Sequence, residues 1–275
     1  MNAPSMPGRG YVGGGSIAAI CELSPHTTKL EAYLHIVEGS EPASPDKQAF
    51  FDSRRELEPW AAAKFARRTS LSIVRSNERY QDDEFPWAKA EIDFEASDGG
   101  NGETKTVNES SAWLWGNADL GEEPPMYVEI QAMWGMGVHP ASHCYVNAMI
   151  GFDKHYVYRV ERDDDLIRQV RQRAADFWNH HIIPRRPPAP SNLRDVLTLY
   201  GRDSGRAVEA SPEVKAALES LSATKNQQKL IGLKREAEEF LIKKFMLDAG
   251  TLTVGGITAA TWKADSRGTR IFRVK

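Results

Sequence analysis

Residues 93–106 read DFEASDGGNGETKT and place charged side chains on both sides of a glycine-rich turn. The turn SDGGNG predicts a hairpin, with one strand over 87–96 and the next beginning at Glu103. Side chains at i and i+2 of a strand point to the same face, about 7 Å apart, so Glu103 and Lys105 are expected side by side. Asp93 would come alongside from the preceding strand. Such a trio is either a surface ion pair or a divalent-metal site beside a polarising lysine.

Apolar periodicity predicts helices and strands on both sides of this hairpin. Helices are expected at 16–38 (two short ones broken at SPHT), 46–68, 124–137 and 163–181, and further strands at 71–76, CYVNAMIGF (144–152) and HYVYRVER (155–162). The order of helix, mixed strands, helix, strands and helix predicts an α/β (α+β) fold with helices flanking a sheet.

The proline-rich stretch IIPRRPPAP (182–190) predicts a domain boundary. We therefore expect one domain at 1–188 and an accessory region at 189–275. In the accessory region, Pro212 to Leu247 is interpreted as two helices, and the last 25 residues as short strands with a Gly-Gly turn.

The composition is that of an ordinary globular protein, with 41% apolar and 27% charged residues and a net charge of −3. This charge weakens a nucleic-acid hypothesis without excluding it, because a local positive groove is sufficient. Two cysteines are too few for a four-thiolate metal site. The N-terminus MNAPSMPGRG has no apolar signal-peptide core, and no apolar run approaches the ~20 residues that cross a membrane. We expect a cytoplasmic protein.

The hairpin spacing D-x9-E-x-K is not unique. Two other sets share it, namely Asp203, Glu213 and Lys215, and Asp119, Glu129 and Gln131 with glutamine in place of lysine. The first of these cannot converge on one ion, because Ser-Pro begins a helix there and helical i and i+2 side chains point about 200° apart. On the residues alone, the hairpin set and the Glu129 set both remain candidate metal sites, with a surface ion pair as the alternative.

Several stretches, in the same order along nearly the whole chain, resemble YqaJ-type viral recombinases, relatives of lambda exonuclease within the PD-(D/E)XK nucleases. They are RGYVGGGSIAAICELSPHTTKLEAYL (9–34), ELEPWAAAKFARRTS (56–70), AEIDFEASDGGNGETKTVNESSAWLWG (90–116), PPMYVEIQAMWGM (124–136) and MIGFDKHYVYRVERDDDLI (149–167). GRAVEA and ATWK in the tail also resemble tails attached to such domains. The resemblance implies a PD-(D/E)XK core, a central mixed β-sheet flanked by helices, and it favours the hairpin trio as the site.

By the same resemblance, Asp93 and Glu103 would bind Mg²⁺ or Mn²⁺, two ions per site, with the Thr104 carbonyl as a further ligand. Hard oxygen ligands suit these ions. Lys105 would orient or help to deprotonate the attacking water, and Glu58 would complete the metal shell. The implied reaction is hydrolysis of a phosphodiester.

The resemblance also implies that Arg9 and Ser16 bind the 5′-terminal phosphate of DNA, with Gln131 as a further DNA contact. Three residues depart from the family pattern, and one of them is Phe94, which follows Asp93 where glycine is usual. Glu129 stands where glutamine is usual and is expected as an additional metal ligand, and Glu91 would repel a phosphate.

The implied function is a 5′→3′ double-strand DNA exonuclease of phage or prophage origin in a bacterial cytoplasm. It would leave 3′ single strands for a partner annealing protein and act as a ring-shaped homotrimer. No association with a membrane is expected. A structure-specific endonuclease using the same site is one alternative. A non-catalytic module that binds DNA ends is another, raised by Glu91 and Glu129.

Overall fold

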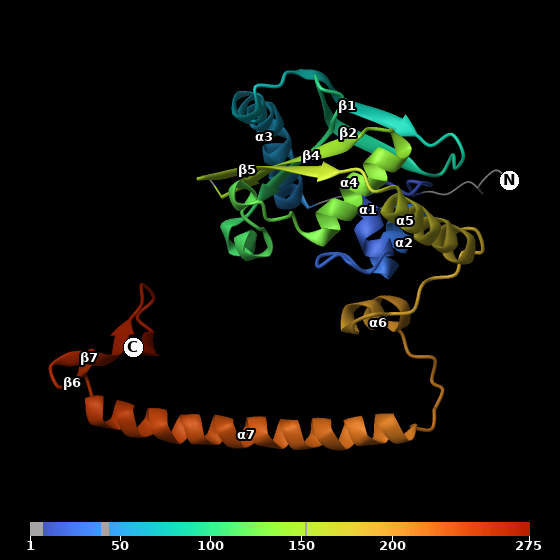
Figure 1. Cartoon of the computed structure of the whole chain (residues 1–275). Coiled ribbons are helices and arrows are strands. Elements are labelled where there is room, and N and C mark those ends of the chain that lie inside the picture. Colours follow the sequence, from blue (N-terminus) through green and yellow to red (C-terminus); the bar gives the residue numbers. More distant parts are fainter. Residues whose placement is uncertain (1–7, 40–43, 152) are drawn as a thin grey trace. The chain divides into compact units, whose positions relative to one another are not determined.

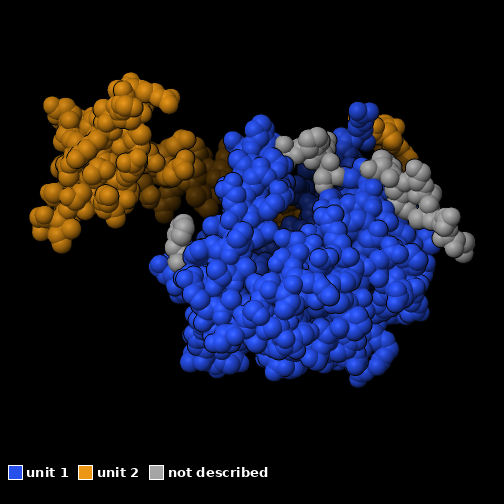
Figure 2. Space-filling model, turned by 90° about the horizontal axis from the view of Figure 1, so that it is seen from above, with its two compact units in different colours: residues 1–202 blue, residues 203–275 orange. Residues whose placement is uncertain are grey.

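The computed structural model describes residues 8–39, 44–151 and 153–275 (Figure 1). The chain divides into two compact units, Met1–Arg202 and Asp203–Lys275 (Figure 2). Each unit has its own β-sheet. No helix in the described ranges is long and apolar enough to cross a membrane.

The first unit alternates helices and strands largely where the sequence predicts them. The helices are α1 (Gly14–Ile20), α2 (Lys29–Val37), α3 (Pro45–Thr69), α4 (Met126–Val138), α5 (Asp164–Phe177) and α6 (Leu193–Tyr200), with short helical turns η1 (Glu109–Leu114), η2 (Ala118–Leu120) and η3 (Trp178–Ile182). The strands are β1 (Ile73–Gln81), β2 (Lys89–Ala96), β3 (Asn101–Val107), β4 (His143–Ile150) and β5 (Lys154–Glu161). The predicted hairpin is confirmed as β2 and β3, whereas β1 extends well beyond the predicted 71–76.

The described strands of this unit form one mixed sheet in the order β1-β2-β3-β4-β5. β3 and β4 run parallel, and the other neighbours run antiparallel. The turn between β2 and β3 depends on Gly99, whose φ of +88° suits a residue without a side chain, and on Asp98, whose carboxylate accepts the Gly100 N–H at 3.2 Å. The predicted α/β (α+β) class with a mixed sheet and flanking helices is confirmed.

Helices α3 and α4 cover opposite faces of the sheet (Figure 1). Neighbouring residues of a strand point to opposite faces. In β4, Asn147 faces α3, where its Nδ2 donates to the Ala61 carbonyl at 3.1 Å, and Val146 packs in the same cluster as Met133 of α4. Each helix therefore presents one side to the central strands that carry the hairpin residues.

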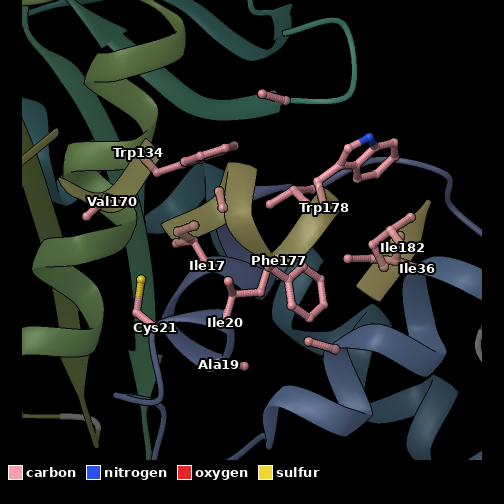
Figure 3. Packing of buried hydrophobic residues seen from close by; sticks show 14 of the residues in the cluster. Ile17, Ala19, Ile20, Cys21, Ile36, Trp134, Val170, Phe177, Trp178 and Ile182 are labelled. Atoms are coloured by element: carbon pink, nitrogen blue, oxygen red, sulfur yellow. The ribbon is translucent and has the colours of Figure 1, made fainter. Parts of the chain in front are cut away.

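A buried cluster fixes the helices around α4. Ile17 of α1, Ile36 of α2, Trp134 of α4, Phe177 of α5 and Ile182 of η3 are at most 2% exposed and belong to one core (Figure 3). Burial of large apolar side chains is the main favourable term in folding, at roughly 1.5–3 kcal/mol for each one. This core holds the start of α1 against α4, close to the hairpin.

Helix α6 belongs to the first unit. Asp195 of α6 is 1% exposed and accepts hydrogen bonds from the Thr28 hydroxyl at 2.9 Å and from the Ser191 backbone N–H at 2.9 Å. Because Thr28 also caps α2, these bonds tie α6 to the start of that helix. The two compact units divide after α6, at Arg202, whereas the predicted boundary lies after residue 188.

The second unit contains α7 (Pro212–Met246) and an antiparallel sheet of β6 (Thr251–Val254), β7 (Ile257–Ala264) and β8 (Arg270–Val274). The prediction of two helices before Leu247 is wrong, since α7 is continuous. The polar stretch SATKNQQK (222–229) interrupts the apolar pattern, but it contains neither proline nor glycine and does not break a helix. The short strands and their Gly-Gly turn are confirmed.

Candidate metal-binding and catalytic site

The strands of the hairpin separate at Asp93. The β2–β3 ladder pairs Phe94 with Gly102 and Glu95 with Asn101, and continuing it by one residue places Asp93 level with Glu103. The Asp93 carboxylate instead accepts the backbone N–H of Thr104, at 2.7 Å. The two carboxylates predicted from the hairpin therefore meet at the point where the ladder ends. The structure brings the Thr104 N–H to Asp93, and ligation by the Thr104 carbonyl stays a prediction.

Lys105 and Gln131 complete a hydrogen-bonded cluster with Glu103. The Lys105 Nζ donates to Glu103 Oε1 at 2.6 Å and to Gln131 Oε1 at 2.8 Å, and Gln131 Nε2 donates to Glu103 Oε1 at 2.7 Å. Glu103 is buried, and Lys105 and Gln131 are partly buried. Asp93, Glu103, Lys105 and Gln131 are named the carboxylate–lysine cluster below. Gln131, expected as a DNA contact, here holds the lysine and the glutamate in place.

The charges of the cluster shift two pKa values. Burial, followed by the charge of Glu103, raises the pKa of Asp93 to about 8, and Glu58 adds to the effect. Burial alone would lower the pKa of Lys105, but the charge and hydrogen bond of Glu103 and the charge of Asp93 hold it above its ordinary value. Lys105 is therefore a cation at neutral pH, and it balances one carboxylate charge. The raised pKa of Asp93 reflects the cost of a second carboxylate charge in the same buried place without a further cation.

A divalent metal ion would provide the further positive charge that an ionised Asp93 needs. Mg²⁺ is commonly held by one or two carboxylates, with waters and substrate phosphates filling its other positions, and the Asp93–Glu103 pair provides that donor set. Across residues 8–39, 44–151 and 153–275, no three Asp, Glu, His or Cys side chains gather closely enough to enclose an ion by themselves. The arrangement thus suits an ion shared with substrate rather than a closed structural site.

Glu58 lies near the cluster without joining it. The residue is exposed on α3, and its charge acts on Asp93. Its role as a metal ligand stays a prediction, whereas its placement beside the cluster agrees with the expected helix over the site.

A cavity of about 470 Å³ adjoins the cluster, and Asp93 and Gln131 are part of its wall. Arg9 also lines it, next to the glycines 13–15 at the start of α1. A Cβ added at Gly14 would lie 3.2 Å from Gln131 Cγ, so glycine lets this backbone approach the cluster. Ser16 is buried and is not part of the wall, so Arg9 alone of the predicted phosphate-binding pair faces this cavity.

Three further side chains in the wall of this cavity were not predicted from the sequence. Lys89 and Arg79 add positive charge to the wall of the cavity. Tyr11 also lines the wall, and the Lys89 Nζ lies over its ring, 5.1 Å from the ring centroid. A signal was present, because Lys89, Glu91 and Asp93 are spaced by two along one strand and so share a face. Arg79 is paired with Glu91 by strand register, and its Nε donates to the Glu91 carboxylate at 3.1 Å.

The structure gives no support to the expectation that Glu129 joins the metal ligands. Residues 126–138 form the helix α4, in which i and i+2 side chains point about 200° apart, and Gln131 is the one that faces Lys105. Burial and the charges of Glu123 and Asp163 raise the pKa of Glu129, so its electrostatic neighbours are elsewhere. Asp119 forms an ion pair with Arg68. The alternative set of Asp119, Glu129 and Gln131 therefore does not converge.

Substitution of Glu129 by glutamine is accordingly expected to leave the metal requirement unchanged. The Mg²⁺ titration of activity should superimpose on that of the parent, because α4 turns Gln131 and not Glu129 toward Lys105. The matched change is Gln131→Ala, which removes two hydrogen bonds of about 1 kcal/mol each and should lower the rate about tenfold or more. A shifted titration for Glu129→Gln would restore this residue to the metal site.

A larger cavity, of about 870 Å³, lies elsewhere in this unit. Its wall is mostly apolar and includes Phe50, Leu57 and Trp60 of α3 with Met149 of β4. Asp93, Glu103 and Lys105 are not part of its wall. Size therefore does not identify the reactive site here, whereas the chemistry of the smaller cavity does.

Known proteins resemble this chain in fold and in sequence. The fold is similar to the crystal structure of an alkaline exonuclease (LHK-Exo) from Laribacter hongkongensis, with a TM-score of 0.50 and 19% identity, over 62% of this chain and 87% of that one. A phage-related exonuclease structure from Haemophilus somnus 129PT also matches, with a TM-score of 0.45 and 15% identity, over 60% of this chain and 90% of that one. The first of these defines the class of fold, an exonuclease-like α/β core.

The sequence comparisons are more particular. Residues 8–142 match the family model described as the YqaJ-like viral recombinase domain. The uncharacterized protein YqaJ of Bacillus subtilis (strain 168) is 24% identical over 260 residues, which cover 92% of this chain and 80% of that protein. This similarity agrees with the resemblance seen in the sequence, and the matched residues 8–142 include Arg9, Glu58 and the whole carboxylate–lysine cluster.

Proposed function

We propose that this chain is a metal-dependent deoxyribonuclease that degrades double-stranded DNA from 5′ to 3′ and leaves 3′ single strands. The observation that carries the proposal is the carboxylate–lysine cluster, in which Asp93 and Glu103 meet beside a cationic Lys105. The YqaJ-like domain and the exonuclease-like fold support the same activity.

The residues of the cluster have distinct tasks in this proposal. Asp93 and Glu103 would hold Mg²⁺ or Mn²⁺, two ions per site, which would stabilise charge on the phosphate and generate hydroxide near neutral pH. Lys105, being charged, donates hydrogen bonds and orients the attacking water rather than taking its proton. Gln131 fixes the positions of the Lys105 Nζ and the Glu103 carboxylate through its two hydrogen bonds.

The cavity of about 470 Å³ is the proposed site for the DNA end. Arg9 provides a guanidinium, which suits forked contacts with a terminal phosphate. Glu91 in the same wall would repel a phosphate, but its pairing with Arg79 offsets part of that charge. Lys89 adds a second cation to the wall. The wall therefore favours a 5′-phosphorylated end despite its two carboxylates.

Arg9→Ala is expected to reduce the preference for 5′-phosphorylated over 5′-hydroxyl ends about ten- to a hundredfold, since a hydrogen bond to a charged group is worth roughly 1.5–3 kcal/mol. The measurement compares kcat/KM on the two ends for parent and variant. Arg67→Ala is the control, because this exposed arginine of α3 does not line the cavity. Equal rates of the parent on both ends would remove the basis for the role of Arg9.

Polarity and topology of cleavage test the function itself. Linear duplex with and without 5′-phosphate, labelled at either end and digested in Mg²⁺, should release nucleotides from the 5′ end and leave the other strand. A closed circular plasmid should stay intact. Nicking of the circle would indicate the structure-specific endonuclease, and binding of ends without any metal-dependent release would indicate the non-catalytic module.

We further propose that the protein works as a ring-shaped homotrimer around duplex DNA, with an annealing protein that takes up the 3′ strand, in a bacterial cytoplasm. A closed ring would let a chain of net charge −3 stay on DNA through local contacts. Sedimentation of the parent in solution distinguishes a trimer from a monomer, and the latter result would contradict the ring.

A further inference from the structure

The small sheet of the second unit has two unlike faces. Trp262 of β7 pairs with Phe272 of β8, and the Lys243 Nζ of α7 lies 5.8 and 5.1 Å from their ring centroids. Arg270 lies on the same strand and donates to the carbonyls of Leu247 and Ala249, just after α7. The face with Trp262 and Phe272 is therefore the one that packs against the end of α7.

The opposite face carries the positive charge. Because strand side chains alternate, Lys263, Ile271, Arg273 and Lys275 point away from the face of Trp262 and Phe272. The register confirms the grouping, with Lys263 opposite Ile271 and Arg273 opposite Thr261. Lys263, Arg273 and Lys275 are exposed, and in the part of the chain that the structure describes no ion pair involves them. These three residues are named the cationic face.

The charge of this segment contrasts with that of the chain. Residues 250–275 contain five Lys and Arg and one acidic residue, Asp265, whereas the whole chain has 35 Lys and Arg against 38 Asp and Glu. The Asp265 carboxylate lies in the β7–β8 turn, where it accepts the backbone N–H groups of Arg267 and Thr269. Arg267 is exposed in that turn and adds a fourth cation beside the sheet.

We propose that the cationic face binds the phosphate backbone of DNA without regard to sequence. Lysine and arginine that project from a strand face meet phosphate oxygens and release condensed counterions, which is the main source of non-specific DNA binding. The choice of DNA over another polyanion rests on the proposed function, in which DNA is the substrate of the first unit. A second contact on the same DNA raises its effective concentration at the site of cleavage. This assigns the second unit a role in holding the substrate.

The test uses the full chain with Lys105→Ala, so that the DNA survives, and measures fluorescence anisotropy of a labelled duplex over a salt series. Lys263→Gln, Arg273→Gln and Lys275→Gln together should weaken binding about tenfold at low salt. They should also reduce the slope of log K against log[salt] by about 2–3, because each phosphate contact contributes about 0.9. The far-ultraviolet circular dichroism spectrum should not change.

The matched control removes three exposed cations of α7, Lys215→Gln, Lys225→Gln and Lys229→Gln, with the same loss of charge. It should leave both the affinity and the salt slope close to those of the parent. An unchanged salt slope for the cationic-face variant would overturn the proposal, as would an equal loss in the α7 control. Binding is read without cleavage, so a failure of the proposed nuclease activity would appear separately, in the digestion assay.

Discussion

Lys105→Ala is expected to lower the rate of duplex cleavage about a hundredfold or more while binding of DNA ends stays within a few-fold of the parent. The Lys105 Nζ contacts Glu103 and Gln131 inside the cluster, so its loss removes the positive charge from the proposed site of the reacting phosphate. One preorganised donor of this kind is worth about 10²–10³ in rate. Single-turnover cleavage at saturating DNA measures the effect without the binding step.

Two variants control this prediction. Lys105→Met keeps the apolar stem without the charge and should lose as much activity, which separates charge from packing. Lys89→Ala removes a lysine that lines the adjoining cavity but contacts Tyr11, so it should weaken binding while the single-turnover rate stays near the parent. Cleavage by Lys105→Ala at the parent rate would show that the reaction occurs elsewhere.

Asp93→Asn is expected to abolish metal-dependent cleavage and yet to raise the Tm of the protein in chelator at pH 8 by a few degrees. In the folded chain the pKa of Asp93 is raised to about 8 from an ordinary value of 3.8, through burial and the charge of Glu103. Between those pH values the folded state holds a proton that the unfolded state has lost. The free energy of unfolding therefore falls as pH rises from about 4 to about 8. Asparagine does not titrate, and a gain of about 1–2 kcal/mol raises Tm by about 3–6 °C.

Asp98→Asn should change the Tm in the opposite direction and lower it. Burial alone would raise the pKa of Asp98, but hydrogen bonds from Tyr145 and Gly100 and the charge of His143 hold it below its ordinary value. Its ionised form therefore stabilises the fold above pH 4, and this stabilisation is lost as pH falls through the folded pKa. Thermal unfolding in chelator at pH 5 and pH 8 distinguishes the two sites. Parallel Tm curves for the parent and Asp93→Asn would contradict the charge repulsion at the cluster.

The sequence alone determined the hairpin and the neighbouring positions of Asp93, Glu103 and Lys105, and the family resemblance favoured this trio as the site. Gly-rich turns and alternating strands are local signals, and a period of two places Glu103 and Lys105 on one face before any tertiary contact is known. The structure confirms that pair at 2.6 Å, with Asp93 beside it. The helices of the first unit could be predicted for the same reason, since the spacing of apolar residues is a local property of the sequence.

Residues that meet across elements were decided only by the tertiary structure. The stretch YVEIQ is compatible with either a strand or a helix. It forms part of the helix α4, in which Gln131 rather than Glu129 faces Lys105. The domain boundary likewise depends on Asp195 meeting Thr28, a contact between residues 167 positions apart. The tertiary structure also decided the charge of the site. The pKa of Asp93 depends on burial and on the charge of Glu103, which lies on another strand. Local patterns specify which face a side chain takes, whereas long-range packing decides what that face meets.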